Sequence, residues 1–121
     1  MDKTFLLIGA LTGFIGVTLG AFGAHALRSR LSPEMLVVFE TGVRYQMYHA
    51  FAILIVALML GRMGGWLIST AGWLFAAGIV LFSGSLYLLA LTGVTVLGAI
   101  TPMGGLAFLL GWACLALAAL L

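Results

Sequence analysis

The chain has 121 residues, of which 64% are hydrophobic and 7% are charged, and its formal net charge is +2. A soluble domain has about 45–50% apolar and about 25% charged residues, so this composition excludes a water-soluble fold and predicts an integral membrane protein. Five scattered basic residues are too few for a nucleic-acid groove, and the single Cys114 excludes an internal disulfide. At about 20 residues per span, the length allows one domain, 1–121, with four or five spans.

The first apolar run, residues 4–27, is predicted to be the first span. It is longer than the apolar core of a cleaved signal peptide, about 7–15 residues, which is the competing interpretation. Five glycines in it recur at intervals of four and three, so they share one face of a helix: Gly9, Gly13, Gly16, Gly20 and Gly23. Small residues let membrane helices approach closely, so this face predicts a packing interface, inside the subunit or between subunits. A lining for a ligand or pore is the alternative.

The second helix is predicted to begin at Pro33. Ser32 is a favourable N-cap, proline suits the first helical position, and Glu34 faces the positive end of the helix dipole. Residues 34–60 contain no proline and one glycine, Gly42, which leaves two arrangements open. One is a single long helix. The other, which we prefer because residues 34–39 mix polar and apolar side chains, is a short interfacial helix, about 33–41, bent at Gly42 into a span of about 43–61.

Two further apolar runs predict spans at about 66–91 and 103–121, joined by a short apolar turn. The fold class is therefore all-α, an integral membrane bundle of four transmembrane helices with both termini on one side. Lys3 and Arg62 lie on one side of the membrane, while Arg28 and Arg30 lie on the other. Counting Arg44 with the second pair favours the cytoplasm for the segment from Arg28 to Arg44.

Most of the polar side chains outside the turns belong to one predicted cluster between the first three spans. Glu40, Arg44 and Tyr48 recur every four residues, in the order that favours a Glu–Arg ion pair on one helical face. The first connection places the end of the first span, with His25, at the same membrane level as the start of the second span. The third span runs back across the membrane, so its serines are expected at that level too. The candidate cluster is His25, Glu40, Arg44, Tyr45, Gln46, Tyr48, His49, Ser83, Ser85 and Tyr87.

Four stretches carry a resemblance to a known family: GAFGAHAL at 20–27, FETGVRYQMYHA at 39–50, LFSGSLYLL at 81–89 and TPMGG at 101–105. Together they extend over essentially the whole chain. The sequence resembles the YgdD/YwdK-like family of small bacterial inner-membrane proteins of unknown function, which has a mitochondrial relative. The resemblance implies a four-span, multi-pass protein of the bacterial inner (plasma) membrane, and it implies no reaction, substrate or cofactor.

The residues themselves favour a structural, accessory or interaction protein whose polar cluster joins helices through hydrogen bonds. The partners expected are the lipid bilayer and either further copies of the chain or a larger membrane complex. The alternative is a small transporter, channel or lipid- or quinone-binding module that uses the cluster, because ionisable groups inside a membrane are candidate functional sites and histidine can relay protons. His25 and His49 on separate helices also leave haem ligation open. No nucleophile, phosphate-loop or metal-ligand motif is present, so we expect no enzyme activity, metal or cofactor.

Overall fold

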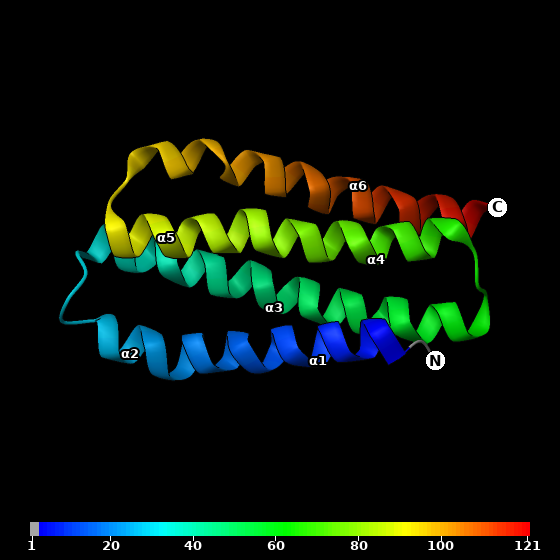
Figure 1. The fold of residues 1–121 in the computed structure, drawn as a ribbon, viewed down its shortest axis with the longest axis horizontal. Helices are drawn as coiled ribbons and strands as arrows, with labels where there is room; N and C mark the ends of the chain where they lie inside the picture. Colours follow the sequence, from blue (N-terminus) through cyan, green and yellow to red (C-terminus); the bar gives the residue numbers. More distant parts are fainter. Residues whose placement is uncertain (1–2) are drawn as a thin grey trace.

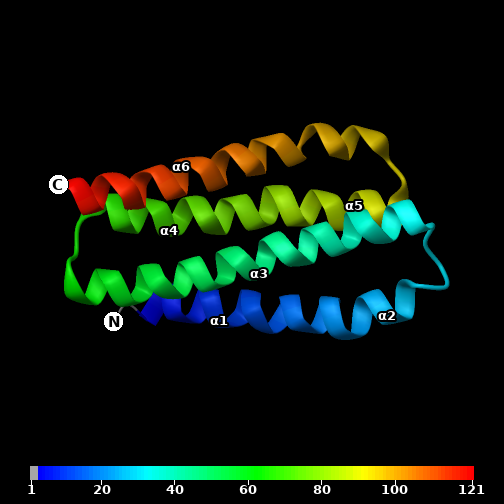
Figure 2. The same cartoon turned by 180° about the vertical axis from the view of Figure 1, so that it is seen from behind.

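The computed structural model describes residues 3–121, which form helical rods lying side by side, with their connections at the two ends (Figure 1). Four of these helical segments are long and apolar enough to cross a membrane: Lys3–Leu27, Pro33–Arg62, Trp66–Thr92 and Thr95–Leu120. The described start of the chain and its C-terminus lie at the same end (Figure 2). The predicted all-α, four-span fold is confirmed.

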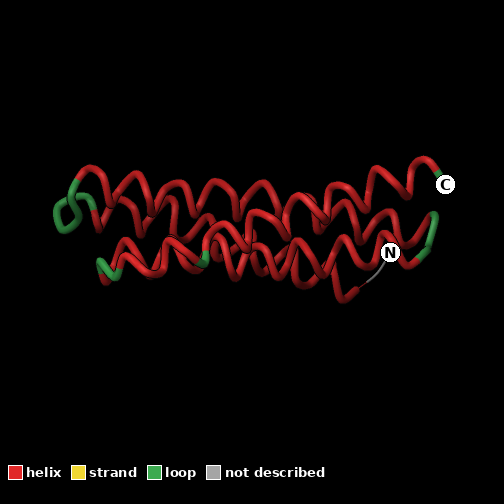
Figure 3. The backbone as a smooth tube through the Cα atoms, turned by 90° about the horizontal axis from the view of Figure 1, so that it is seen from above, coloured by secondary structure: helices red, strands yellow, loops and turns green. Residues whose placement is uncertain are grey.

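Shorter elements make up these spans. The first contains α1 (Lys3–Val17), the π-helix η1 (Thr18–Gly23) and α2 (Ala24–Leu27), and the second is α3 (Pro33–Arg62). The third contains α4 (Trp66–Gly78), the π-helix η2 (Ile79–Ser83) and α5 (Gly84–Thr92), and the fourth contains the 3₁₀-helix η3 (Thr95–Ala99) and α6 (Thr101–Leu120). Figure 3 shows how little of the described chain lies outside helices.

The predicted start of α3 is confirmed in detail. Ser32 has extended backbone angles, and its Oγ accepts a hydrogen bond of 3.2 Å from the Met35 N–H, while Pro33 occupies the first helical position. The helix then continues without interruption through Gly42, so the break expected there is absent. Gly42 is instead the point where α3 packs closely against the third span. A Cβ placed on it would lie 2.8 Å from Cε1 of Tyr87. Residues 33–41 are helical as predicted, but they belong to the same rod as the second span.

The connections explain where two of the spans end. Gly64 and Gly65 have φ values of 66° and 100° in the turn between α3 and α4, and Gly93 has a φ of 73° directly after α5. These positive φ values are accessible to glycine without strain and are rare for other residues. After Gly93 the chain regains helical structure at Thr95, so much of the expected apolar turn before the fourth span is itself helical.

The core of the bundle is built from aromatic rings seated on glycines of neighbouring helices. A Cβ added to Gly72 would meet the ring of Phe5, and one added to Gly111 would meet Phe75. Both phenylalanines are almost completely buried, together with the aliphatic side chains of α3 that complete this core. In a bilayer, where lipid is as apolar as the side chains, such close packing is a main source of association between helices.

The glycine face of the first span packs against α3 of the same chain. A Cβ on Gly9 would lie 2.7 Å from Leu54, one on Gly16 would lie 2.5 Å from Met47, and one on Gly20 would lie 2.9 Å from Val43. Gly23 faces Phe39 at 3.5 Å, whereas an added Cβ on Gly13 would have no neighbour within 4 Å. Four of the five glycines therefore pack inside the subunit, which is one of the two locations that the sequence left open for this interface.

Candidate functional site

Gln46 is the centre of the polar cluster. It lies on α3, is 3% exposed, and uses both ends of its amide to reach other helices. Its Nε2 donates to the Thr12 carbonyl oxygen of α1 at 2.8 Å, while its Oε1 accepts from the Tyr87 hydroxyl of α5 at 2.6 Å. One side chain thus connects the first, second and third spans where water is absent and every polar group needs a partner.

Two serines of the third span extend this network in opposite directions. Ser83, which is fully buried, donates to the Gly42 carbonyl oxygen of α3 at 2.6 Å. This carbonyl is accessible because Gly42 has no side chain and the helices approach closely at this point. Ser85 shares a 2.6 Å hydrogen bond with the Thr101 hydroxyl of α6 and donates to the Phe82 carbonyl oxygen of its own span. The third span is therefore bonded to both of its neighbours.

His49 forms a second polar centre, one turn further along α3. The indole Nε1–H of Trp112 can only donate, so Nε2 of His49 accepts this bond at 3.1 Å. The ring proton then resides on Nδ1, which donates to the Tyr45 carbonyl oxygen at 2.7 Å. The imidazole also stacks on the Phe108 ring, with centroids 3.6 Å apart and planes inclined by 7°. Both nitrogens of a neutral His49 are thus occupied within the protein.

The remaining members of the predicted cluster do not join this network. His25, Glu40, Arg44 and Tyr48 have exposed side chains, and no ion pair connects Glu40 with Arg44 among the described residues. Tyr45 is 36% exposed and packs its ring on Phe82, with centroids 4.7 Å apart. The structure therefore brings together Gln46, Ser83 and Tyr87, places His49 and Ser85 in adjoining bonds to α6, and directs the charged residues outward.

The two histidines considered for haem are not neighbours. Gly23 packs opposite Phe39, so His25 lies beyond Phe39, at least ten residues along the α3 axis from His49. Ten residues of helix correspond to about 15 Å. Within residues 3–121, no three His, Cys, Asp or Glu side chains are grouped so that they could hold a metal ion.

Sequence reasoning missed three partners in these bonds, Thr12, Thr101 and Trp112. Thr12 lies among the glycines of α1, its hydroxyl donates to the Ile8 carbonyl of its own helix, and the atom that accepts from Gln46 is its backbone oxygen, which every residue type has. Trp112 stands in the last apolar run, where an indole N–H requires an acceptor. That requirement was a usable signal, although it does not identify His49 as the acceptor.

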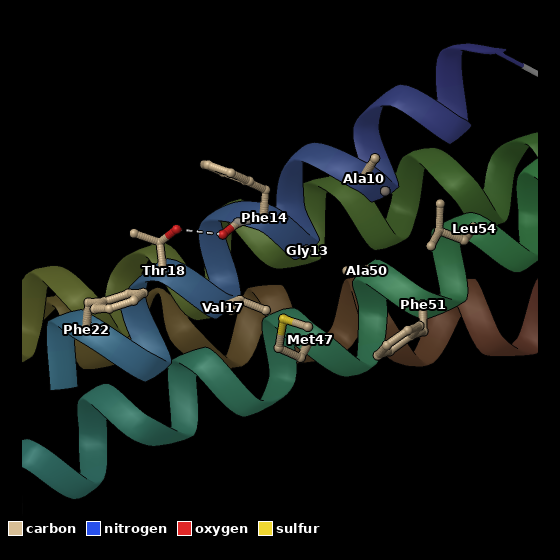
Figure 4. Close-up of a pocket in the computed structure, with 11 residues that line it drawn as sticks. Ala10, Gly13, Phe14, Val17, Thr18, Phe22, Met47, Ala50, Phe51 and Leu54 are labelled. Atoms are coloured by element: carbon tan, nitrogen blue, oxygen red, sulfur yellow. Dashed lines mark hydrogen bonds between the residues drawn. The ribbon is translucent and has the colours of Figure 1, made fainter. Parts of the chain in front are cut away.

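Two apolar grooves open on the outer surface beside the polar network. The α1–α3 groove has a volume of about 600 Å³, and Gly13, Phe14, Phe22, Met47 and Phe51 are among its lining residues (Figure 4). The α3–α6 groove, of about 560 Å³, is lined by rings that include Tyr45, His49, Phe82, Phe108 and Trp112. Both grooves would face acyl chains or another membrane helix.

These features define a class: a helical integral membrane protein with four spans held together by glycine contacts and interhelical hydrogen bonds.

The family model described as "Protein of unknown function (DUF423)" matches residues 19–105, and the chain belongs to this family. It is 48% identical to the UPF0382 membrane protein YwdK of Bacillus subtilis, over 97% of this chain and 96% of that protein. It is also 48% identical to a UPF0382 membrane protein of Staphylococcus epidermidis, over 98% of this chain and 96% of the relative. No solved structure matches the chain. The resemblance to YwdK-like proteins is thereby confirmed.

Proposed function

We propose that this protein is a non-enzymatic structural or accessory component of the bacterial inner membrane that acts by associating with membrane proteins. The observation that carries the proposal is the Gln46 amide, whose two ends bond to the first and third spans. The inward polar groups are used to join helices, which leaves the outer grooves and the outward charges as the surfaces available to a partner. Bundles of apolar helices belong to inner membranes, whereas outer-membrane proteins are closed barrels.

Association is the property to measure. The protein is purified in a mild detergent or a native nanodisc after chemical cross-linking in the membrane, and its assembly mass is determined by light scattering. We expect an assembly heavier than one chain, formed with further copies or with a second membrane protein. A single chain without a cross-linked partner, in cells that express the protein at its normal level, would contradict the proposal.

The variants Gly13→Leu and Gly16→Leu form a matched pair for this experiment. Gly16 contacts Met47 inside the subunit, so a larger side chain there disturbs the fold itself. Gly13 lies open in the α1–α3 groove, where an added Cβ would have no neighbour within 4 Å, so we expect leucine there to leave the helix contact intact. Loss of association by Gly13→Leu, with the thermal stability of the monomer retained, would place a partner in that groove.

One observation favours a second candidate function, the binding of a lipid-soluble ring compound such as a quinone. Five of the nine residues that line the α3–α6 groove carry aromatic rings, and one of them, Tyr45, is partly exposed. A titration of the protein in vesicles with a soluble-tail quinone analogue, followed by tryptophan fluorescence, tests this function. Quenching that disappears in Trp112→Phe, while Trp66 and Trp73 remain, would support it. Flux of protons or ions through proteoliposomes that is lost in His49→Ala would instead support a transporter.

A further inference from the structure

The outer face of α3 carries a continuous row of exposed residues. Their separations of three or four positions place them on one side of the helix, which is opposite to the side that carries Gln46. The row is Val37, Glu40, Arg44, Tyr48, Phe51, Ile55 and Leu58, and we call it the α3 outer face. It is continuous with the α1–α3 groove, because Phe51 belongs to both (Figure 4).

The two charges of this face lie at the edge of the hydrocarbon layer. Arg44 is 18 residues from Arg62, which corresponds to about 27 Å of helix and is close to the thickness of a bilayer core, about 30 Å. The Ser83–Gly42 hydrogen bond puts η2 level with this part of α3. Exposed Leu88 and Leu91 lie five and eight residues beyond Ser83, so apolar surface continues roughly 7–12 Å past the level of Gly42, which lies between the two charges. Glu40 and Arg44 are thus in surroundings of lower dielectric than water.

Opposite charges in such surroundings attract each other more strongly than in water. Glu40 and Arg44 have no ion-pair partner in the described chain, although they are one helical turn apart. A face that carries one charge of each sign is complementary to itself when a two-fold axis relates two copies. An anionic phospholipid would neutralise Arg44 but would leave Glu40 unpaired beside its own negative charge.

We propose that the α3 outer face is the interface of a parallel homodimer, in which Glu40 of each copy pairs with Arg44 of the other. The proposal rests on the proposed function and names its partner as a second copy of this chain. Both copies have the same orientation in the membrane, so the two pairs lie at one level about the two-fold axis. Tyr48 and Phe51 continue the contact toward the bilayer centre and join it to the α1–α3 groove.

The test uses two charge-reversal variants that fail separately and succeed together. Protein labelled with a donor or an acceptor dye is reconstituted into phosphatidylcholine vesicles, and energy transfer reports association. In Glu40→Arg the interface carries four positive charges, and in Arg44→Glu it carries four negative charges. We expect each variant alone to lose most of the wild-type energy transfer, and an equimolar mixture of the two to recover it. A pair formed within one helix cannot be restored by mixing two different chains.

Matched controls separate this interface from a general effect of charge. Arg30→Glu and Glu34→Arg make the same changes near the first connection, off the α3 outer face, and we expect both to retain energy transfer. Arg44→Lys keeps the charge and is also expected to retain it. Recovery in the mixture shows in addition that both charge-reversal variants are folded.

Three results would overturn the proposal. The first is energy transfer at the wild-type level in either charge-reversal variant alone, and the second is a mixture of the two folded variants that shows no energy transfer. The third is a wild-type protein that is monomeric and holds a phospholipid in native mass spectrometry, when the Arg44→Gln variant does not hold it. A wild-type monomer that still cross-links to a different membrane protein would overturn the homodimer while leaving the proposed accessory function intact. Absence of both kinds of association would overturn both.

Discussion

The two sides of α3 use their polar residues in opposite ways. On the inner side, Gln46 and His49 are buried: Gln46 bonds to two other helices through both ends of its amide, and His49 accepts a bond from Trp112 of α6 while its other nitrogen donates to Tyr45 of its own helix. On the outer side, Glu40, Arg44 and Tyr48 are exposed, and the two charges have no ion-pair partner among residues 3–121. All five residues lie within ten positions of one helix. The comparison indicates that the inner side maintains the fold and that the outer side is available for a partner, so substitutions on the two sides should separate stability from association.

The largest effect is expected at the glycine contact between α1 and the inner side of α3. Gly16→Leu forces a side chain against Met47, whose Sδ would lie 2.5 Å from the added Cβ, and overpacking of this kind costs up to about 3 kcal/mol. Unfolding in mixed micelles, followed by circular dichroism, measures the loss. Gly13→Leu is the matched control, because its added Cβ has no neighbour within 4 Å. Equal destabilisation by the two substitutions would contradict the assignment of Gly16 to the inner contact.

Removal of the central amide is expected to have the next largest effect. Gln46→Leu deletes the bonds to Thr12 and Tyr87 and leaves the Tyr87 hydroxyl without its acceptor. A buried polar group left unpaired costs about 1–3 kcal/mol, and we expect a loss of free energy of unfolding near the middle of that range. The same micelle titration measures it. Stability equal to the wild type would show that the amide does not hold the three spans together.

A smaller effect is expected at the bond between α3 and α6. Trp112→Phe keeps an aromatic ring but removes the N–H that donates to His49 Nε2. Interhelical hydrogen bonds in membranes contribute about 0.6 kcal/mol on average and up to about 1.7 kcal/mol, so we expect a loss of about 1 kcal/mol. Solid-state ¹⁵N NMR of the imidazole provides a second measurement, since Nδ1 should carry the proton in the wild type. A proton found on Nε2 would be incompatible with the Trp112 bond.

The smallest effect on the fold is expected on the outer side. Arg44→Gln and Tyr48→Phe should change the stability of the monomer by less than about 0.5 kcal/mol, because exposed residues away from special contacts contribute little. Unfolding is measured at a dilution in detergent at which the chain is monomeric. A loss comparable to that of Gln46→Leu would place these side chains in the internal network and would end the contrast between the two sides.

Much of the fold followed from the sequence because its signals are local. Hydropathy predicted the spans, the Ser32–Pro33–Glu34 start was readable from capping chemistry, and glycine spacing predicted a close helix contact. The π-helices at 18–23 and 79–83 were not predicted. A change of hydrogen-bond register within an apolar helix depends on how neighbouring helices pack, and no residue type in these segments specifies it.

The site was harder to predict than the fold. The sequence placed Glu40, Arg44 and Tyr48 on one helical face and Gln46 among the candidates, but helical periodicity gives only relative angles. Which face points inward is determined by the glycines of α1 and by Gly42, whose partners belong to distant segments. The bond from Trp112 to His49 joins residues 63 positions apart, and no pattern within either helix indicates such a pairing.

The claim that the first three spans are joined through the inner side of α3 is tested most directly by a double-mutant cycle between Gln46 and Tyr87. Free energies of unfolding are measured in bilayer-like micelles for Gln46→Leu, Tyr87→Phe and the double variant. We expect a coupling energy of about 1 kcal/mol, in the range found for hydrogen bonds between membrane helices. Losses that simply add, with a coupling energy near zero, would contradict the claim.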